Sequence, residues 1–281
     1  MNKKRILTVV IVILSVAVLG IVGFILFKNF NNQASNEKYK TAASSYVKST
    51  AGSNGSGDSD NNSGGSSGKD STQPSTVKPK ENPIEFSGLN DRNTDIYAWI
   101  TVPGTLVDYP VLQSPTNDNF YLDHDLDGNY AFAGSIYSQK CNMRTFQDRV
   151  TVLYGHNMLD GSMFATLHRY EDPEFFNSNS SFTIYTDDKQ LDYSVVSAFE
   201  YDDRHIMNSF NFSDDEAYEA FIDDVVNPRS VSKNVRKDVK VTTDDKLVVL
   251  STCLDYGEGR YLVVGKLEKE TPLQSALQSR L

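Results

Sequence analysis

Three short apolar runs, each next to a reactive side chain, restrict the second half of this chain to a β-rich fold. Apolar runs of this length bounded by polar segments are typical of strands. A rigid sheet can hold the ends of neighbouring strands within reach of one bound molecule. The runs and their side chains are Val150–Tyr154 with His156, Leu247–Leu250 with Cys253, and Tyr261–Val264 with Arg260.

The three side chains together meet the requirements of one reaction. Attack of a thiol on an amide needs a nucleophile, a proton donor for the leaving amine and a cation for the oxyanion. Cys253, His156 and Arg260 are residues of these three kinds. We therefore predict an active site where the strands end.

Each of these residues also has an alternative interpretation. The chain has two cysteines, so a secreted domain could pair Cys253 with Cys141, although Cys141 lies in a polar stretch that resembles a loop. Arg260 could pair with a carboxylate at a strand edge. The histidines that compete with His156 for the acid–base role are His124, His168 and His205.

The residues around the three side chains resemble the sortase family, the membrane-anchored cysteine transpeptidases of Gram-positive bacteria. The family motif has a histidine late in a strand, a strand with a TLxTC-like end, and an arginine on the next strand. Here these are Tyr154–Met158, Leu250–Cys253 and Arg260. The resemblance runs from Asn82 to Glu268. The segments that resemble class B in particular are Trp99-Ile100, Val107–Val111, Tyr121–Asp125 and Gly134–Ile136, with a helical segment between the later strands.

The resemblance implies a fold and a mechanism. The fold is mainly β, a closed eight-stranded barrel with peripheral helices. Cys253 attacks the Thr carbonyl of a C-terminal sorting motif on a secreted surface protein, Arg260 stabilises the oxyanion, and His156 protonates the departing amine. An amine of a peptidoglycan precursor resolves the thioester, or a pilin amine in a pilin-linking class B sortase. The implied motif is of the Asn-Pro-x-Thr-Asn or Pro-x-Thr-Gly type, and no cofactor is needed.

Several neighbouring residues are expected to line the groove for the sorting peptide. These are Ser251, Thr252, Leu122, Asn119 and Tyr185. In some class B sortases an acidic residue directly follows the nucleophile, whereas here Leu254 intervenes before Asp255. Asp255 could therefore orient His156, or it could be a solvated surface carboxylate.

The N-terminus predicts a retained membrane anchor. Basic residues 3–5 precede the uncharged apolar run Ile6–Phe27, and about 20 residues suffice for a helix to cross a bilayer. A cleaved signal peptide would have a shorter apolar core and a small-residue cleavage site. We expect residues 1–5 in the cytoplasm and the catalytic domain outside the membrane of a single-pass protein.

Composition divides the rest of the chain into three parts. Residues 28–81 are mostly polar and small, which predicts a flexible extracytoplasmic linker. Residues 82–270 have the size and aromatic content of one catalytic domain, expected to fold alone as a monomer. Residues 271–281 form a C-terminal tail.

Secondary structure is predicted within the catalytic domain. A helix is expected between Ser213, which forms a capping-box pattern with Glu216, and Pro228. Shorter helical pieces are expected at Arg92–Trp99 and Met163–Tyr170. The expected strands are Leu106–Val111, Gly134–Tyr137, Val150–Tyr154, Ser181–Thr186, Gln190–Phe199, Lys246–Ser251 and Tyr261–Leu267.

The net charge argues against nucleic-acid binding, and an incomplete motif argues against an EF-hand calcium site. A net charge of −10 argues against nucleic acid as a partner, because phosphate binding needs a basic surface. Asp123-x-Asp125-x-Asp127-Gly128 copies the first half of an EF-hand loop, but position 12 is Gly134 instead of Glu. We predict no metal site.

Two rival functions fit parts of the pattern. A cell-wall cysteine peptidase or amidase would hydrolyse the same kind of bond, but such enzymes usually place the cysteine at a helix N-terminus. Cys253 instead follows a β-run. A stalked adhesin would give Cys253, His156 and Arg260 no reason to lie at adjoining strand ends.

Overall fold

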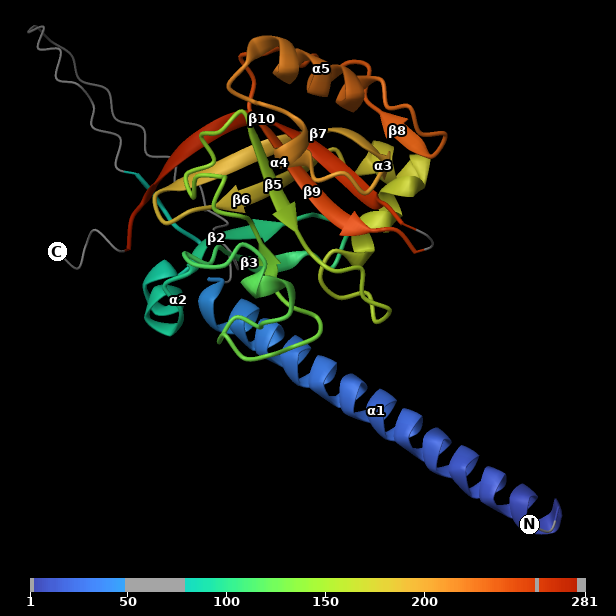
Figure 1. The fold of residues 1–281 in the computed structure, drawn as a ribbon. Helices are drawn as coiled ribbons and strands as arrows, with labels where there is room; N and C mark the ends of the chain where they lie inside the picture. Colours follow the sequence, from blue (N-terminus) through green and yellow to red (C-terminus); the bar gives the residue numbers. More distant parts are fainter. Residues whose placement is uncertain (1–2, 49–78, 256–257, 277–281) are drawn as a thin grey trace, which may run out of the picture.

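The strands of the chain form one sheet that closes on itself into a barrel (Figure 1). A computed structural model describes residues 3–48, 79–255 and 258–276. The strands within these residues are β1 (Lys80–Glu81), β2 (Ile96–Thr101), β3 (Asp108–Leu112), β4 (Ile136–Tyr137), β5 (Val150–Tyr154), β6 (Ser181–Tyr185), β7 (Lys189–Tyr201), β8 (Lys233–Val235), β9 (Leu247–Cys253) and β10 (Arg260–Gln274).

Two long strands close the barrel. Neighbouring strands follow the order β1-β10-β9-β5-β4-β3-β2-β6-β7-β8, and β10 also pairs antiparallel with β7. Among the described strands, eight form the ring, with β1 and β8 added at its edges. The predicted closed eight-stranded barrel is confirmed.

The helices lie around the barrel (Figure 1). In the described part of the chain they are α1 (Lys3–Tyr46), α2 (Phe86–Arg92), α3 (Pro173–Ser178), α4 (Ile206–Ser209), α5 (Asp215–Val226) and the 3₁₀ helices η1 (Phe120–Leu122) and η2 (Ala165–Glu171). The predicted helix before Pro228 is α5. Its N-cap is Asp214, whose carboxylate accepts the N–H of Ala217 at 2.9 Å, one residue later than the predicted Ser213.

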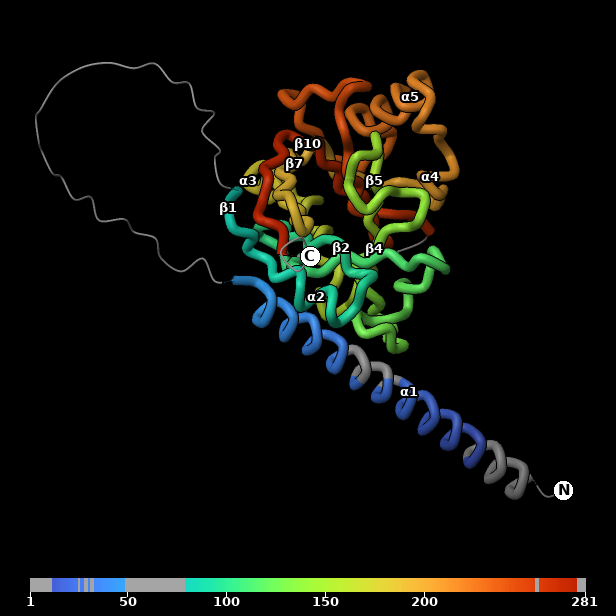
Figure 2. The backbone as a smooth tube through the Cα atoms, turned by 90° about the vertical axis from the view of Figure 1, so that its left-hand side faces the viewer, coloured from blue at the N-terminus to red at the C-terminus, as the bar shows by residue number. Residues whose placement is uncertain are grey.

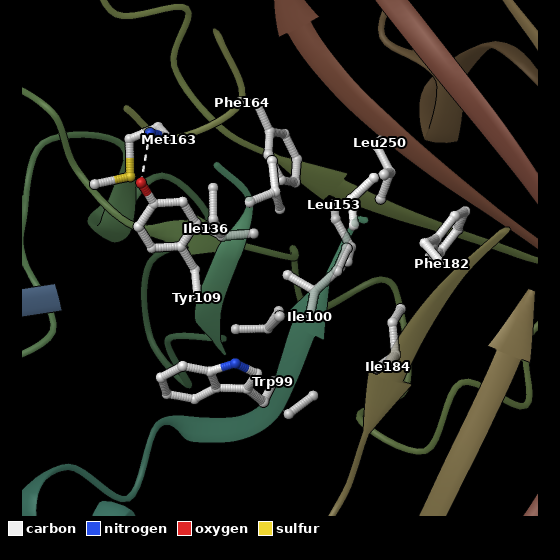
Figure 3. Packing of buried hydrophobic residues seen from close by; sticks show 14 of the residues in the cluster. Trp99, Ile100, Tyr109, Ile136, Leu153, Met163, Phe164, Phe182, Ile184 and Leu250 are labelled. Carbon is white, nitrogen blue, oxygen red and sulfur yellow. Dashed lines mark hydrogen bonds between the residues drawn. The ribbon is translucent and has the colours of Figure 1, made fainter. Parts of the chain in front are cut away.

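Strands β5 and β9 are buried on both faces, which explains their uninterrupted apolar sequences. Leu153 and Leu250 belong to the inner cluster of the barrel (Figure 3). The alternate residues Val152 and Val249 belong to an outer cluster with Phe221 of α5. Each fully buried side chain of this kind contributes about 1.5–3 kcal/mol, so α5 fixes the two strands from outside.

The predicted helical pieces have different outcomes. In Arg92–Trp99, α2 ends at Arg92 and β2 begins at Ile96, so the helical prediction is wrong for every residue after Arg92. Trp99 is fully buried in β2, paired with Pro110 on one side and Tyr185 on the other. These long-range pairings outweigh the local pattern. Met163–Tyr170 is confirmed in part by the 3₁₀ helix η2.

Helix α1 continues beyond the apolar run, and its C-terminal end packs on the barrel (Figure 2). Tyr39 and Ala42 lie on one helix face and are buried, and Val47 forms a β-bridge with Ile84. The sequence predicts a flexible linker from residue 28, but the structure is helical through Tyr46. A few apolar residues at helical spacing suffice to dock the helix. The segment is mostly polar, so its overall composition does not indicate these residues. Residues 49–78 of the predicted linker lie outside the described residues.

The N-terminal part of α1 projects away from the barrel (Figures 1 and 2). Several of its large apolar side chains are exposed, including Leu14, Leu19 and Phe24. Across the described residues, we find no helix with both the length and the apolar character needed to span a membrane.

The end of the catalytic domain lies later than predicted. β10 runs to Gln274, and β1 pairs with its last residues, Lys80 with Leu273 and Glu81 with Gln274. The predicted boundaries at residues 82 and 270 therefore cut off two strand ends that complete the sheet. Residues 277–281 of the predicted tail lie outside the described residues.

Candidate active site

Cys253 and Arg260 lie opposite each other where β9 ends and β10 begins. The antiparallel register pairs the two residues directly. Arg260 Nη1 is 3.8 Å from Cys253 Sγ, and it donates a 2.9 Å hydrogen bond to the carbonyl of Gly259. A planar, permanently charged donor group therefore lies beside the sulfur.

Strand β5 brings His156 to the same end of the barrel. It runs parallel to β9 with Tyr154 opposite Ser251, and the N–H of Gly155 donates to the carbonyl of Ser251 at 3.1 Å. A Cβ on Gly155 would lie 2.6 Å from Ile136 Cδ1, so only glycine fits between strand and histidine. The parallel pairing makes both strands end together.

Two neighbours orient the imidazole of His156. Nε2 is 2.8 Å from the backbone carbonyl of Leu122, which can only accept, so the hydrogen bond assigns a proton to Nε2. The ring of Phe132 stacks on the imidazole with centroids 5.8 Å apart. Nδ1 is then the ring nitrogen available for proton exchange with a bound molecule.

The three predicted catalytic residues line one cavity of about 210 Å³. Ser251 and Thr252, both buried, contribute to its wall from the end of β9. Asn119 and Leu122 contribute from the segment around η1. The structure thus brings these four predicted groove residues to the reactive groups.

Tyr185, the fifth predicted groove residue, lies at the opposite end of the barrel. It ends β6 opposite Gln190 of β7, which pairs with Thr271 of β10. Arg260 is at the other end of β10. Because β6 runs antiparallel to β7, the last residue of β6 lies at the end of the barrel opposite the cavity. The sequence of β6 alone does not indicate this direction.

Asp255 contacts Asn157. The Asn157 Nδ2 donates to Asp255 Oδ1 at 2.7 Å and to the carbonyl of Cys253 at 3.1 Å. His168 Nε2 is 2.9 Å from the same carbonyl. Asp255 is exposed, as in the surface alternative, and its carboxylate binds Asn157, which also holds the backbone of Cys253.

Sequence reasoning missed other residues of the cavity wall, among them Tyr137, Gln139 and Tyr154. His205, weighed only as an acid–base candidate, also lies there and donates from Nε2 to Gln139 Oε1 at 2.7 Å. Burial raises the pKa of Tyr137 to about 12, with Arg260 acting in the opposite direction. Its phenol is therefore neutral and can donate a hydrogen bond. The tyrosines resemble ordinary strand residues, so the sequence carried no signal for them.

The structure contradicts the disulfide alternative, because Cys141 and Cys253 are both free thiols. Cys141 is an exposed residue, but partial burial of its sulfur and the nearby Asp118 carboxylate raise the pKa of its thiol. A raised pKa disfavours the nucleophilic thiolate. Of the two cysteines, only Cys253 lines the cavity.

The acidic segment that imitates an EF-hand is bound by cations of the protein itself. Asp125 is buried, and its carboxylate accepts the N–H groups of Asp127 and Asn129 at 3.0 Å each. Lys38 Nζ lies 2.5 Å from Asp125 and 3.1 Å from Asp127, and Arg92 Nε lies 2.6 Å from Asp127. Among the described residues, no cluster of His, Cys, Asp and Glu has the composition of a metal site.

A cysteine and an arginine paired at the end of a closed barrel, with a histidine on the same cavity, define a cysteine enzyme suited to acyl transfer. The sortase domain model matches residues 100–268. The chain belongs to the sortase family of cysteine transpeptidases, and its relatives place it in class B.

Three relatives illustrate the match. Sortase B of Listeria monocytogenes is 34% identical over 186 residues, which cover 65% of this chain and 74% of that protein. The structure of Clostridium perfringens sortase B has a TM-score of 0.59 and 30% identity, covering 66% of this chain and 100% of the other. A Streptococcus pyogenes class B sortase involved in pilus biogenesis has a TM-score of 0.57 and 30% identity, covering 66% and 98%.

Proposed function

We propose that this sortase cleaves a C-terminal sorting motif after Thr and transfers the new acyl end to an amine. The thiol proton of Cys253 passes to His156 and Sγ forms a bond to the Thr carbonyl carbon. The C–N bond then breaks as His156 gives that proton to the leaving amine. The thioester on Cys253 is then attacked by an acceptor amine. The C–S bond breaks, a new amide forms, and the proton that the amine loses passes through His156 back to the sulfur of Cys253.

The contact between Arg260 and Cys253 supports this proposal most directly. A carbonyl oxygen that becomes an oxyanion while its carbon bonds to Sγ would lie within a few ångströms of the sulfur. Arg260 Nη1, 3.8 Å from Sγ, is a charged donor at that distance. Donors placed where charge develops typically contribute ~10²–10³-fold in rate.

The cavity wall supports a peptide substrate that enters along β9 and η1. Ser251, Thr252, Asn119 and Leu122 are the residues we assign to the sorting peptide. A motif of the Asn-Pro-x-Thr-Asn type fits the class B relationship. The acceptor is an amine of a peptidoglycan precursor, or of a pilin, in line with the Streptococcus pyogenes relative.

We further propose that the chain is a single-pass membrane protein whose catalytic domain is a monomer outside the membrane. The apolar run Ile6–Phe27 follows three basic residues, and a positive N-terminus favours the cytoplasmic side. Both features lie in α1, whose exposed apolar side chains would be covered by lipid. A carbonate-resistant membrane fraction and protease access to the catalytic domain in intact cells test this topology; release by carbonate would contradict it.

Trapping of the thioester tests the chemistry. The full chain in detergent is incubated with a sorting peptide, quenched in acid, and measured by intact mass. We expect an adduct with the mass of the peptide up to Thr, located on Cys253 and absent from Cys253→Ala. Adduct on Cys141, or turnover by Cys253→Ala, would contradict the proposal.

A further inference from the structure

We propose that the C-terminal end of α1 is a positioning element of the active site, which acts on His156 through residues 120–135. The inference rests on the proposed acid role of His156. Tyr39 is the central residue of this positioning element, and Lys38 and Ala42 support it. Two hydrogen bonds, one close backbone packing contact and an ion cluster connect the helix to the imidazole.

The first contact joins the helix to residues 134 and 135. Tyr39 is 2% exposed, and its hydroxyl lies 2.8 Å from the carbonyl oxygen of Gly134 and 2.8 Å from Ser135 Oγ. The hydroxyl donates to the carbonyl, and Ser135 Oγ in turn donates to the carbonyl of His124 at 2.9 Å. The Tyr39 ring packs edge-on against Tyr109 with centroids 5.5 Å apart. Tyr39 therefore connects the helix, the barrel and the segment.

The second contact joins Gly134 to the group that binds His156. Gly134 has φ +57°, and a Cβ on it would lie 2.4 Å from the carbonyl oxygen of Leu122. That oxygen accepts the hydrogen bond from His156 Nε2 at 2.8 Å. Phe132, from the same segment, stacks on the imidazole. The position of residues 132–134 thus determines both neighbours of the His156 ring.

An ion cluster attaches the same segment to α1 independently of Tyr39. The Asp125 side chain is 4% exposed and binds Lys38 Nζ. Asp127 lies between Lys38 and Arg92 of α2. A buried carboxylate needs such a partner, because an unpaired buried charge is strongly destabilising. Removal of α1 would leave Asp125 without its cation.

The catalytic unit therefore includes α1 from about Lys38 onward. A barrel without this helix would retain Cys253 and Arg260 in register, because β9 and β10 hold them. It would lose the support of the Leu122 carbonyl and hence the orientation of His156. Misplacement of a catalytic group by about 1 Å can cost ~10²-fold in rate.

The test compares an amide with an ester substrate, using the full chain in detergent. The ester carries oxygen in place of the scissile nitrogen, and its leaving group needs protonation far less than an amine does. Ala42→Glu undocks the helix, since Ala42 is fully buried, and Tyr39→Phe removes only the hydroxyl. Thr41→Glu and Lys40→Met change exposed neighbours on the same helix.

We expect kcat/KM on the amide to fall about 10–10²-fold in Ala42→Glu and severalfold in Tyr39→Phe, with the ester much less affected. His156→Ala should show the same selective loss. The two control variants should match wild type on both substrates. Unchanged amide turnover in Tyr39→Phe and Ala42→Glu, or equal loss on amide and ester, would overturn the inference. Turnover that persisted in Cys253→Ala would overturn the proposed function and this inference with it.

Discussion

Arg260 lies directly across the sheet from Cys253, with Nη1 3.8 Å from Sγ, because β9 and β10 pair these two residues in register. A shift of one residue in this pairing would turn one of the side chains to the other face of the barrel. The buried runs that precede Cys253 and follow Arg260 hold the register. The geometry of the site is therefore a property of the core of the barrel.

Substitution of Arg260 tests the value of this pairing. Arg260→Ala should slow acylation by at least ~10²-fold, the usual loss for an oxyanion donor. Arg260→Lys should recover only part of the rate, because an ammonium is compact and lacks the planar fork. The rate of acyl-enzyme formation, followed by quenching and mass spectrometry, gives the comparison. Wild-type rates in Arg260→Lys would show that charge alone is required.

The two cysteines should differ completely. Cys253→Ala should abolish turnover, whereas Cys141→Ala should retain nearly all of it, since Cys141 is not on the cavity wall and its thiol pKa is raised. Product formation from a sorting peptide measures both. Loss of turnover in Cys141→Ala, with its melting temperature unchanged, would contradict the assignment.

Gly134 and Gly128 both have positive φ, +57° and +76°, so Gly128 serves as a control for substitution of Gly134. Alanine at either position should cost about 1–2 kcal/mol in backbone strain. Only at Gly134 would the new Cβ also meet the Leu122 carbonyl; at Gly128 the nearest atom is 4.0 Å away. We expect Gly134→Ala to lose amide turnover well beyond Gly128→Ala. Melting curves and kcat/KM measure the two effects separately, and equal turnover in both variants would contradict the role of Leu122.

His168 should matter less than Arg260 but measurably. It donates to the carbonyl of Cys253, which also accepts from Asn157, so His168→Ala leaves one donor in place. The expected fall in kcat is smaller than the ~10²-fold loss at an oxyanion donor. His168→Gln, which retains an N–H donor, should recover part of it. Identical kinetics of His168→Ala and wild type would contradict a role for His168 in holding the backbone of Cys253.

The ion cluster on α1 should be insensitive to pH near neutrality. The hydrogen bond from Arg92, supported by Lys38, lowers the pKa of Asp127 despite partial burial. Burial alone would lower the pKa of Lys38, but Asp125 and Asp127 outweigh it and the net change is a rise. The stabilisation from Asp127 is present above its unfolded pKa of about 3.9 and is lost in acid. That from Lys38 is present below about 10.4 and is lost only at higher pH.

The measurement for the ion cluster is the difference in melting temperature between wild type and Lys38→Met. It should stay constant from about pH 5 to 9 and shrink below about pH 3. The Lys40→Met variant, which changes an exposed lysine two residues further along the same helix, should show no such difference. A difference that disappears between pH 6 and 7 would contradict the assigned partners.

The sequence predicted the parts of the fold that depend on continuous apolar runs. The bounds of β5 are as predicted, and β9 and β10 end and begin near Cys253 and Arg260, because strands buried on both faces have a strong local signature. β2 was not predicted, because Trp99 lies in a strand through its pairing with residues of β3 and β6 that are distant in sequence. Local patterns do not contain such pairings.

The sequence predicted the side chains that carry the chemistry of the candidate site. It did not predict the backbone groups that hold those side chains in place. The partner of His156 is the carbonyl of Leu122, a group that every residue has, so no sequence pattern identifies it. Docking of α1 depends on single contacts of Tyr39 and Lys38 with residues nearly a hundred positions later. Their surroundings in sequence resemble a polar linker.

Partition of the thioester between water and an amine tests the central claim most directly. The full chain in detergent is incubated with a sorting peptide and increasing concentrations of a glycine-type or a diaminopimelate-type amine, and the acid and amide products are measured by mass spectrometry. We expect amide to increase with amine at the expense of acid, and both products to disappear in Cys253→Ala. Free acid as the sole product at every amine concentration, still dependent on Cys253, would contradict transpeptidation and identify a peptidase.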